Sequence, residues 1–546
     1  MSDTPTTQYD AIVIGAGFGG LYALLRLRDE LGLSVRGFDG AGGVGGTWWH
    51  NRYPGARVDA PSAPFYGYTF SKELVDEWTW TETQSTSADV LRYLDHVADR
   101  FDLRRNVRFQ TRVTSARFDE ATERWVVRTD HGDEVTARYL ITGIGCLSAG
   151  QIPNFAGRDT FTGEAYHTGS WPHEGVEFTG KRVGVIGTGS SGVQSIPVIA
   201  RQAEHLHVFQ RTAQYMIPAR HGTVDKAVLD KVKLDYDAIF DRARHSVGGF
   251  PYDVPTRSAL SVDDTERQAI FEQTWQEGGF RFLFGSFSDL RTNLASSETA
   301  AEFIRAKILE TVQDPEVAER LTPRDHPFGS KRTLIDTDYF ETYNRDNVTL
   351  VDIRTNPIAE ITPTGIRTTD GEHYELDIIV YATGFDAMTG SFNRMDIEGR
   401  GGQKLKDKWA AGPVTYLGLG SAGFPNLFMI TGPGSPSVLT NMPIAIEQHV
   451  DWIADAISHL DHNGIGTIEP TAQAEADWGR HVNELAAPTM FMHANSWYLG
   501  ANIPGKPRVF MPYVGGMGTY RTRCEEVVAN GYEGFALGVG APALAD

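Results

Sequence analysis

Two glycine-rich loops of the form GxGxxG, each set between a strand and a helix, constrain the fold of this chain more than any other feature. In the first unit, the apolar run at 11–14 predicts a buried parallel strand, and helically spaced leucines then continue to Gly32. The next strand closes on Asp39. A strand, a glycine loop, a helix, a strand and an acid within about 30 residues form a dinucleotide-binding fingerprint. The loop residues expected to contact the nucleotide are Gly15, Gly17, Phe18 and Gly20.

The same unit recurs near residue 190. Residues 182–186 predict a strand, VQSIPVIARQAE predicts a helix, and HLHVFQ predicts a second strand, followed by Arg211 instead of an acid. One GxGxxG string is weak evidence, but two copies in complete context predict an α/β protein with two Rossmann-like domains. The expected nucleotide contacts here are Gly187, Thr188, Gly189, Ser190, Ser191, Gly192, Arg211 and Thr212.

The residues at the ends of the second strands distinguish the two nucleotides. Asp39 can accept hydrogen bonds from ribose hydroxyls but would repel a 2′-phosphate, whereas Arg211 matches a 2′-phosphate. The second site is therefore expected to bind NADPH, and the first FAD or NAD. A glycine cluster with two tryptophans follows Asp39 directly and favours FAD there. Its expected contacts are Gly46, Thr47, Trp48 and Tyr53.

Changes in pattern along the chain predict five segments. Charged helical sequence without strand signals runs from 222 to 327, and one of its helices is expected to begin at a capping box of Thr299 and Glu302. Strands return at NVTLVDI and YELDIIVYATGFD. The predicted segments are 1–150 (FAD-binding domain, first part), 151–221 (NADP-binding domain, first part), 222–327 (helical insertion), 328–384 (NADP-binding domain, second part) and 385–546 (FAD-binding domain, second part, with the C-terminal segment).

Charge and cysteine content exclude several functional classes. The 546 residues carry a net charge of −20, which disfavours non-specific binding to nucleic acid or anionic lipid. Cys146 and Cys524 are far apart, so neither a disulfide scaffold nor a CxxC redox pair is expected. No signal-peptide pattern begins the chain, and no apolar run reaches about 18 residues. We expect a soluble cytoplasmic protein without a membrane segment, a nucleic-acid partner or a metal site.

Residues 161–172 read FTGEAYHTGSWP, and their glycines predict irregular structure. This stretch resembles FxGxxxHxxxWP, a signature of Baeyer–Villiger monooxygenases. A second pattern of that family is matched by GGTWWHNRYPGARVD at 45–59, and ATGFD at 382–386 also resembles the family. The likeness covers nearly the whole chain. It implies an enzyme with FAD and NADPH/NADP⁺ that uses molecular oxygen to convert ketones to esters or lactones through a flavin C4a-peroxide.

The resemblance also implies roles for individual residues. Arg332 corresponds to the arginine that stabilises the anionic peroxide, and Asp59 to the acid that orients it. Lys331 corresponds to the lysine that joins Arg211 on the 2′-phosphate. Without the family context, a Lys-Arg pair before an apolar run is usually a solvated strand start, and Asp59 a turn carboxylate.

Other matching positions imply conformational roles. His167 is expected to act in domain movement and not as an acid or base, with Trp171 in packing or at a hinge. Trp497 and Asn502 resemble residues that close over NADP. The stretch GSPSVLTNM resembles a loop near the flavin in members acting on aryl, steroid and larger cyclic ketones. The substrate-pocket candidates from this loop are Ser437, Val438, Leu439 and Met442.

Two other functions stay open at this point. Flavin monooxygenases that oxidise sulfur or amine nitrogen resemble the same pattern but usually carry Tyr where Trp171 stands. The third possible function is that of a non-catalytic flavoprotein that senses NADP(H). The presence of both Arg332 and Asp59 argues against it. A monomer or weak homo-oligomer is expected.

Overall fold

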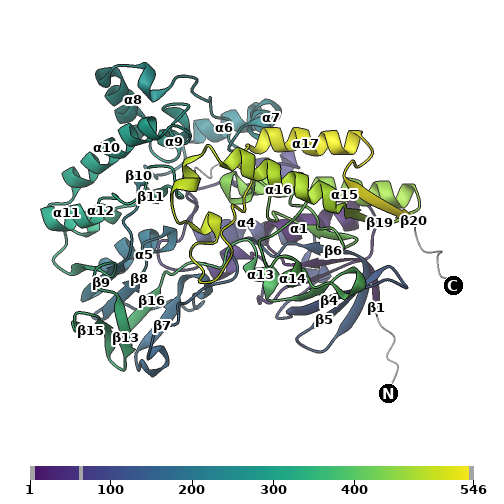
Figure 1. Cartoon of the computed structure of the whole chain (residues 1–546), viewed down its shortest axis with the longest axis horizontal. Helices are drawn as coiled ribbons and strands as arrows, with labels where there is room; N and C mark the ends of the chain where they lie inside the picture. Colours follow the sequence, from purple (N-terminus) through teal and green to yellow (C-terminus); the bar gives the residue numbers. More distant parts are fainter. Residues whose placement is uncertain (1–6, 61–64, 540–546) are drawn as a thin grey trace.

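The computed structural model describes residues 7–60 and 65–539, and its two largest sheets are each built around one glycine loop (Figure 1). In the first sheet, β1, β2 and β3 are parallel neighbours, and β4, β5 and β6 form an antiparallel meander beside them. Its strands in spatial order are β17 (Asp396–Glu398), β4 (Val113–Asp119), β5 (Arg124–Thr129), β6 (Glu134–Thr142), β1 (Thr7–Ile14), β2 (Val35–Phe38) and β3 (Val107–Arg108), with β18 (Leu427–Met429) beside β6.

The second sheet has five strands, all parallel. Its strands in spatial order are β12 (Val348–Asp352), β9 (His205–Gln210), β8 (Arg182–Ile186), β16 (Ile378–Tyr381) and β7 (Glu164–His167). The edge strand β7 lies inside the stretch at 161–172, so the prediction of irregular structure was wrong for these four residues. β7 forms because β16, far away in sequence, offers it a partner from Ile378 to Tyr381.

The two helices that follow the glycine loops pack directly on the loop backbone. They are α1 (Phe18–Leu25), which continues as a π-helical turn over Arg26–Glu30, and α5 (Ser190–Ala200). A Cβ atom on Gly20 would lie 1.8 Å from the Gly15 carbonyl oxygen. The corresponding distance for Gly192 in the second loop is 2.2 Å. The third glycine of each motif therefore permits close packing of helix on strand, as the fingerprint requires.

A group of helices leaves the second sheet after β9 and returns before β12, and it extends from the upper left to the top centre of Figure 1. The strands β10 (Met216–Pro218) and β11 (Leu334–Asp336) pair in parallel at its base. Its helices are α6 (Lys226–Leu234), α7 (Tyr236–His245), α8 (Asp264–Glu277), α9 (Arg281–Gly285), α10 (Leu294–Thr311) and α11 (Pro315–Leu321). Buried aromatic rings of this part, such as Phe271 and Phe282, share one hydrophobic core with β8 and β9.

The C-terminal part returns to the first sheet, supplying β17 and β18, and its long helix α15 packs on α1. The remaining helices are α2 (Thr47–His50), α3 (Lys72–Glu77), α4 (Ser87–Arg100), α12 (Tyr339–Thr342), α13 (Gly390–Asn393), α14 (Leu405–Lys408), α15 (Met442–His462), α16 (Ala472–Ala486) and α17 (Met517–Ala529). The remaining strands are β13 (Ile358–Thr362), β14 (Gly365–Thr368), β15 (His373–Glu375), β19 (Ile465–Pro470) and β20 (Phe535–Val539). Within 7–60 and 65–539, no helix combines the length and apolar character needed to cross a bilayer.

The helix predicted to begin at Thr299 begins earlier, at Leu294, so the predicted capping box was wrong. Asn293 is the N-cap, and its side-chain oxygen accepts hydrogen bonds from the backbone N–H groups of Ala295 and Ser296 at 3.0 and 3.2 Å. Thr299 lies inside the helix and donates to the carbonyl of Ser296 at 2.7 Å. The preceding LASSE segment is helical itself, which leaves Thr299 no free N–H group to cap.

Asn293→Ala is therefore expected to loosen the first turn of α10, because an N-cap contributes about 1 kcal/mol. Amide hydrogen exchange in that turn should accelerate roughly fivefold, which is the factor that corresponds to this free energy. Thr299→Ala is the matched control and should leave the exchange rates of the first turn unchanged. If exchange were faster in Thr299→Ala alone, Thr299 and not Asn293 would be the N-cap of the helix.

Candidate active site

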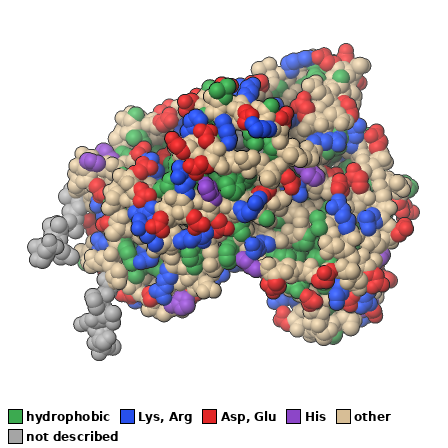
Figure 2. Space-filling model, turned by 180° about the vertical axis from the view of Figure 1, so that it is seen from behind, with side chains coloured by type: hydrophobic (Ala, Val, Ile, Leu, Met, Phe, Trp, Pro, Cys, Tyr) green, Lys and Arg blue, Asp and Glu red, His purple; other side chains and the backbone are tan. Residues whose placement is uncertain are grey.

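A cavity of about 2150 Å³ connects the two glycine loops. This volume exceeds the roughly 300–1,000 Å³ of a typical small-molecule site, so it can hold more than one ligand. Figure 2 shows the face opposite to that of Figure 1, where hydrophobic side chains are visible in the hollow between two lobes. The predicted site residues that line the cavity are Gly15, Gly17, Phe18, Asp39, Gly46, Thr47, Trp48, Tyr53, Asp59, His167, Gly187, Thr188, Gly189, Ser190, Ser191, Arg211, Thr212, Lys331, Arg332, Val438, Leu439, Met442, Trp497 and Asn502.

Four predicted site residues do not line this cavity. Gly20 and Gly192 face the loop backbone, as described above. Trp171 is buried in the core of the second sheet, where its ring lies between those of Tyr166 and Phe178. Ser437 is fully buried behind the cavity wall, in a left-handed conformation with φ of 40°.

The first glycine loop fits a dinucleotide. No side chain among the described residues caps the N-terminus of α1, so its backbone N–H groups are free to bind an anion. A Cβ atom on Gly17 would lie 3.3 Å from the Cα of Gly46, and the two glycine segments thus approach closely. The carboxylate of Asp39 accepts from the N–H groups of Ala16 at 2.6 Å and Ala41 at 2.7 Å. Each carboxylate oxygen keeps a lone pair for a ribose hydroxyl.

The second loop fits a phosphorylated dinucleotide. No described atom lies within 4 Å of the position that a Cβ on Gly189 would take, so the loop faces open space in the cavity. Arg211, Lys331 and Arg354 all line the cavity at this end. Burial lowers the pKa of Lys331, and the charges of Arg211 and Arg354 lower it further, against the opposing effect of Asp325. A phosphate placed among these cations would relieve their repulsion, which fits a 2′-phosphate.

At the junction of the two halves, Arg332 forms an ion pair with Asp59. The guanidinium nitrogen atoms Nη2 and Nε donate to Oδ2 of Asp59 at 3.0 and 3.2 Å, and Nη1 donates to the carbonyl of Val438 at 3.3 Å. Asp59 is nearly buried, whereas 29% of the Arg332 side chain remains exposed within the cavity. The pair thus presents a fixed cation to the cavity, held between the first glycine domain and the C-terminal loop.

Gln194, which the sequence analysis did not single out, extends this pair into a network. Its Nε2 donates to Oδ1 of Asp59 at 2.8 Å, and its Oε1 accepts from the Tyr53 hydroxyl at 2.8 Å. Gln194 belongs to α5, the helix of the second glycine loop. Gly55 has φ of +79°, and a Cβ there would lie 2.2 Å from the Gln194 carbonyl. Glycine between Tyr53 and Asp59 therefore allows the loop to approach α5 closely enough for both contacts.

The charge of Arg332 is stable across the working pH range. Burial lowers the pKa of its guanidinium, but the charge of Asp59 and the hydroxyl of Tyr498 raise it by more, and the net effect is an increase. Tyr498 is itself buried, which raises its pKa, and Arg332 opposes that shift. Arg332 is therefore a permanent cation, and Tyr498 is a second contact that the sequence analysis missed.

His167 connects β7 to the ATGFD segment. Its Nε2 lies 3.2 Å from the Gly384 carbonyl, and its Nδ1 accepts from the N–H of Gly169 at 3.0 Å. Burial lowers the pKa of His167 and outweighs the opposing hydrogen bonds of the ring to the backbone of Gly384 and Gln151. Because Nδ1 accepts a hydrogen bond, the proton of the neutral ring lies on Nε2. Asn502 donates to the carbonyl of Phe385 at 2.7 Å and joins the C-terminal segment to the same turn. His167 and Asn502 thus approach one turn from two sides.

Sequence reasoning could have found one of the missed residues. Arg354 follows β12, the strand next to β9, and residues at the carboxyl ends of neighbouring parallel strands converge on one edge. Gln194 and Tyr498 carried no such signal, because their roles depend on which distant segments pack against them.

Comparison with known proteins was consistent with this geometry. Residues 13–78 match the NAD(P)-binding Rossmann-like domain, and residues 65–228 match the pyridine nucleotide-disulphide oxidoreductase family. A Baeyer–Villiger monooxygenase of Pseudooceanicola batsensis is 48% identical, covering 97% of this chain and 96% of that protein. A phenazine N-monooxygenase of Lysobacter antibioticus is 45% identical, covering 98% of each. The solved structure of an oxidised steroid monooxygenase bound to NADP is 55% identical with a TM-score of 0.93, covering 98% of this chain and 100% of that chain.

A bulky side chain in either glycine loop is expected to block binding of the nucleotide at that loop and to leave the other nucleotide bound. Gly17→Val would place a side chain against Gly46, and the purified protein should lack the yellow colour of bound flavin. Gly189→Val should keep the flavin and lose its reduction by NADPH. Gly479→Val is the matched control, since that glycine in α16 also faces open space but lies outside the cavity. Exchange of the two phenotypes would reverse the assignment of the sites.

Arg211→Ala is expected to raise the Michaelis constant for NADPH about ten- to a hundredfold and hardly change that for NADH. The reason is the loss of charge-assisted hydrogen bonds, which contribute on the order of 1.5–3 kcal/mol each. Steady-state kinetics with both nucleotides measures the ratio. Arg201→Ala is a suitable control, because that arginine pairs with Asp338 at 2.6 Å outside the cavity. An equal loss with NADPH and NADH would contradict the role of Arg211.

Proposed function

The chain belongs to the Baeyer–Villiger monooxygenase family, and we propose that it uses NADPH and molecular oxygen to convert ketones to esters or lactones. As a member of this family it is an enzyme that carries FAD and uses NADP(H). The observation that carries the proposal for the site is the Arg332–Asp59 pair, a permanent cation facing the space between the two nucleotide loops. The match to the disulphide oxidoreductase family does not extend to its chemistry, since Cys146 and Cys524 are unpaired and buried.

The residues of the chain bind the two nucleotides and stabilise charge that develops in the reaction. Bound FAD supplies the reducing equivalents that activate oxygen, and NADPH supplies them to FAD. Arg332 stabilises negative charge that develops on oxygen next to the ketone, because it is a cation already fixed in place. Asp59 orients the guanidinium, and Gln194 fixes the carboxylate in turn by donating to its other oxygen. Trp497 and Asn502 close the NADP side of the cavity.

The substrate is proposed to be a cyclic, aryl or steroid-like ketone. Val438, Leu439 and Met442 line the cavity next to Arg332, and their side chains are apolar. The carbonyl of Val438 accepts from Arg332, so this loop places its apolar groups beside the reacting atoms. The domain boundaries at residues 150, 221, 327 and 384 stay a proposal, as do a cytoplasmic location and a monomeric or weakly associated state.

A second candidate function is oxidation of a ring nitrogen or another heteroatom. It is favoured by the 45% identity to a phenazine N-monooxygenase over nearly the full chain. The same cavity and the same cation would serve that reaction. Product analysis distinguishes the two, because oxygen is inserted beside a carbonyl in one case and placed on the heteroatom in the other. A non-catalytic sensor is disfavoured, since the chain belongs to a family of enzymes.

Arg332→Ala is expected to bind FAD and to be reduced by NADPH at a near-normal rate, but to form about 10²- to 10³-fold less ester or lactone. The charge of Arg332 matters after oxygen enters and has little effect on the preceding hydride transfer. Asp59→Ala should show a smaller loss, because the charge remains while its orientation is lost. Stopped-flow absorbance follows flavin reduction, and chromatography measures the ester and the hydrogen peroxide released in its place.

Two results would contradict this role. A near-normal yield of ester from Arg332→Ala would remove Arg332 from the chemistry. A fall in flavin reduction as large as the fall in oxygenation would instead make Arg332 a residue that positions the nicotinamide.

A further inference from the structure

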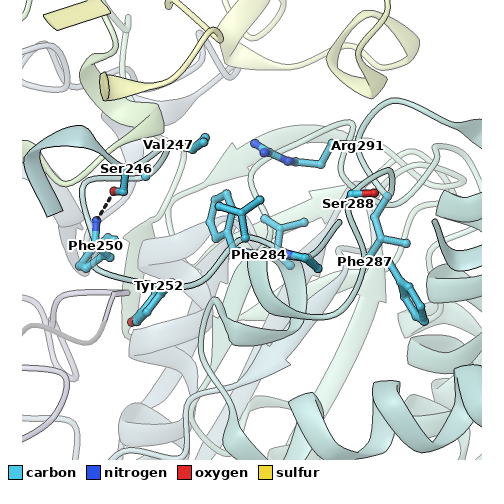
Figure 3. Close-up of a pocket in the computed structure, with 13 residues that line it drawn as sticks. Ser246, Val247, Phe250, Tyr252, Phe284, Phe287, Ser288 and Arg291 are labelled. Carbon is cyan, nitrogen blue, oxygen red and sulfur yellow. Dashed lines mark hydrogen bonds between the residues drawn. The ribbon is translucent and has the colours of Figure 1, made fainter. Parts of the chain in front are cut away.

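A small pocket lies at the edge of the helical insertion, beside the main cavity (Figure 3). Its volume is about 50 Å³, and its walls are mainly apolar side chains from 246–255 and 283–291. Phe250, Leu283, Phe284 and Arg291 line both this pocket and the main cavity, so the two spaces share a wall. Since one water molecule needs roughly 10–15 Å³ of such space, the pocket can hold a small group at the end of a larger ligand.

Arg291 is the one charged side chain in the wall of this pocket, and no described carboxylate pairs with it. Its guanidinium lies over the ring of Phe284, 4.8 Å from the ring centroid, and extends toward Val247 in Figure 3. No hydrogen bond links the half-buried guanidinium to any residue in 7–60 or 65–539, so its five N–H donors are available to a ligand. Burial lowers the pKa of Arg291, and no nearby acid compensates; an arginine nevertheless keeps its charge at neutral pH.

The backbone around Arg291 is tied to both sides of the candidate active site. A Cβ on Gly329, three residues before Arg332, would lie 3.5 Å from Cγ of Arg291. The carbonyl of Arg291 accepts from the N–H of Met490 at 2.8 Å. On the other side of the pocket, the carbonyl of Gly248 accepts from the N–H of Asn441, in the loop that contacts Arg332. The pocket is therefore held in a fixed relation to the reacting centre.

We propose that Arg291 is a specificity-determining residue that binds a carboxylate on the far end of the ketone substrate, with the adjoining apolar chain lying against Phe284 and Phe250. This inference rests on the proposed function and names the class of substrate: a ketone with an apolar body and a terminal carboxylate. A guanidinium without an internal partner binds a carboxylate through two parallel hydrogen bonds. Val247 and Val254, exposed by 38% and 60%, extend the apolar surface at the pocket.

The test compares matched substrates, namely acetophenones with a para-linked carboxylate chain of one to four methylene groups, and their methyl esters. The wild-type enzyme should prefer the best carboxylate over its ester by about ten- to a hundredfold in kcat/KM, as expected for one charge-assisted pair in a partly buried site. Arg291→Gln should abolish this preference, mainly through the KM of the carboxylate, and leave the neutral esters and the flavin content unchanged. Arg291→Lys should restore part of the preference.

Arg281→Gln is the matched control, because Arg281 lies over Tyr252 at 4.2 Å but does not line either cavity. This variant should keep the preference for the carboxylate. Equal kcat/KM for acid and ester in the wild type, or an unchanged preference in Arg291→Gln, would overturn the inference while leaving the proposed function intact. Absence of any oxygenated product from acids and esters alike would instead count against the proposed function. Equilibrium titration of the oxidised enzyme with the same acids gives the affinity independently of turnover.

Discussion

The ion pair between Arg332 and Asp59 is the contact on which the arrangement of this molecule depends. Four separate segments meet there: the loop after the first glycine cluster, helix α5 of the second glycine unit, the chain leaving the helical insertion, and the C-terminal loop at Val438. A buried carboxylate would be costly if any of its partners were missing. Correct placement of both nucleotide-binding halves is therefore a condition for satisfying Asp59, and the cation faces the cavity only when they are in place.

The electrostatics of the cavity contrast with those of the whole protein. The chain carries a net charge of −20, yet the cavity end near the second glycine loop gathers Arg211, Lys331 and Arg354. Without the nucleotide, Asp325 partly offsets this local excess of positive charge, whereas burial and the charges of Arg211 and Arg354 lower the pKa of Lys331. An anionic cofactor thus enters a region prepared for it within a surface that otherwise repels anions.

Local features could be predicted from the sequence, and features formed by distant segments could not. The strands at 182–186 and 205–210 occur as predicted, because apolar β-branched residues and glycine loops specify them locally. Strand β7 was missed because its partner β16 lies more than two hundred residues later in the sequence. The pattern of FTGEAYHTGSWP itself does not predict that pairing. Arg332 and Asp59 were found through a family resemblance, whereas Gln194 is recognisable only once Gly55 brings two domains into contact. Arg291 likewise has no local signature.

The parallel pairing of β10 with β11 has a consequence for how this chain can change. These strands join the two ends of the helical insertion, and Arg332 lies just before β11. The position of Arg332 is therefore set mainly by this pairing at the base of the insertion. Lengthening a closed loop destabilises the fold only slightly, by about 0.6 kcal/mol for each doubling of the loop length. The region that contributes Phe250, Phe284 and Arg291 can thus acquire insertions or new side chains during evolution without displacing the oxygenation chemistry, so that substrate range and reaction type can diverge at different rates.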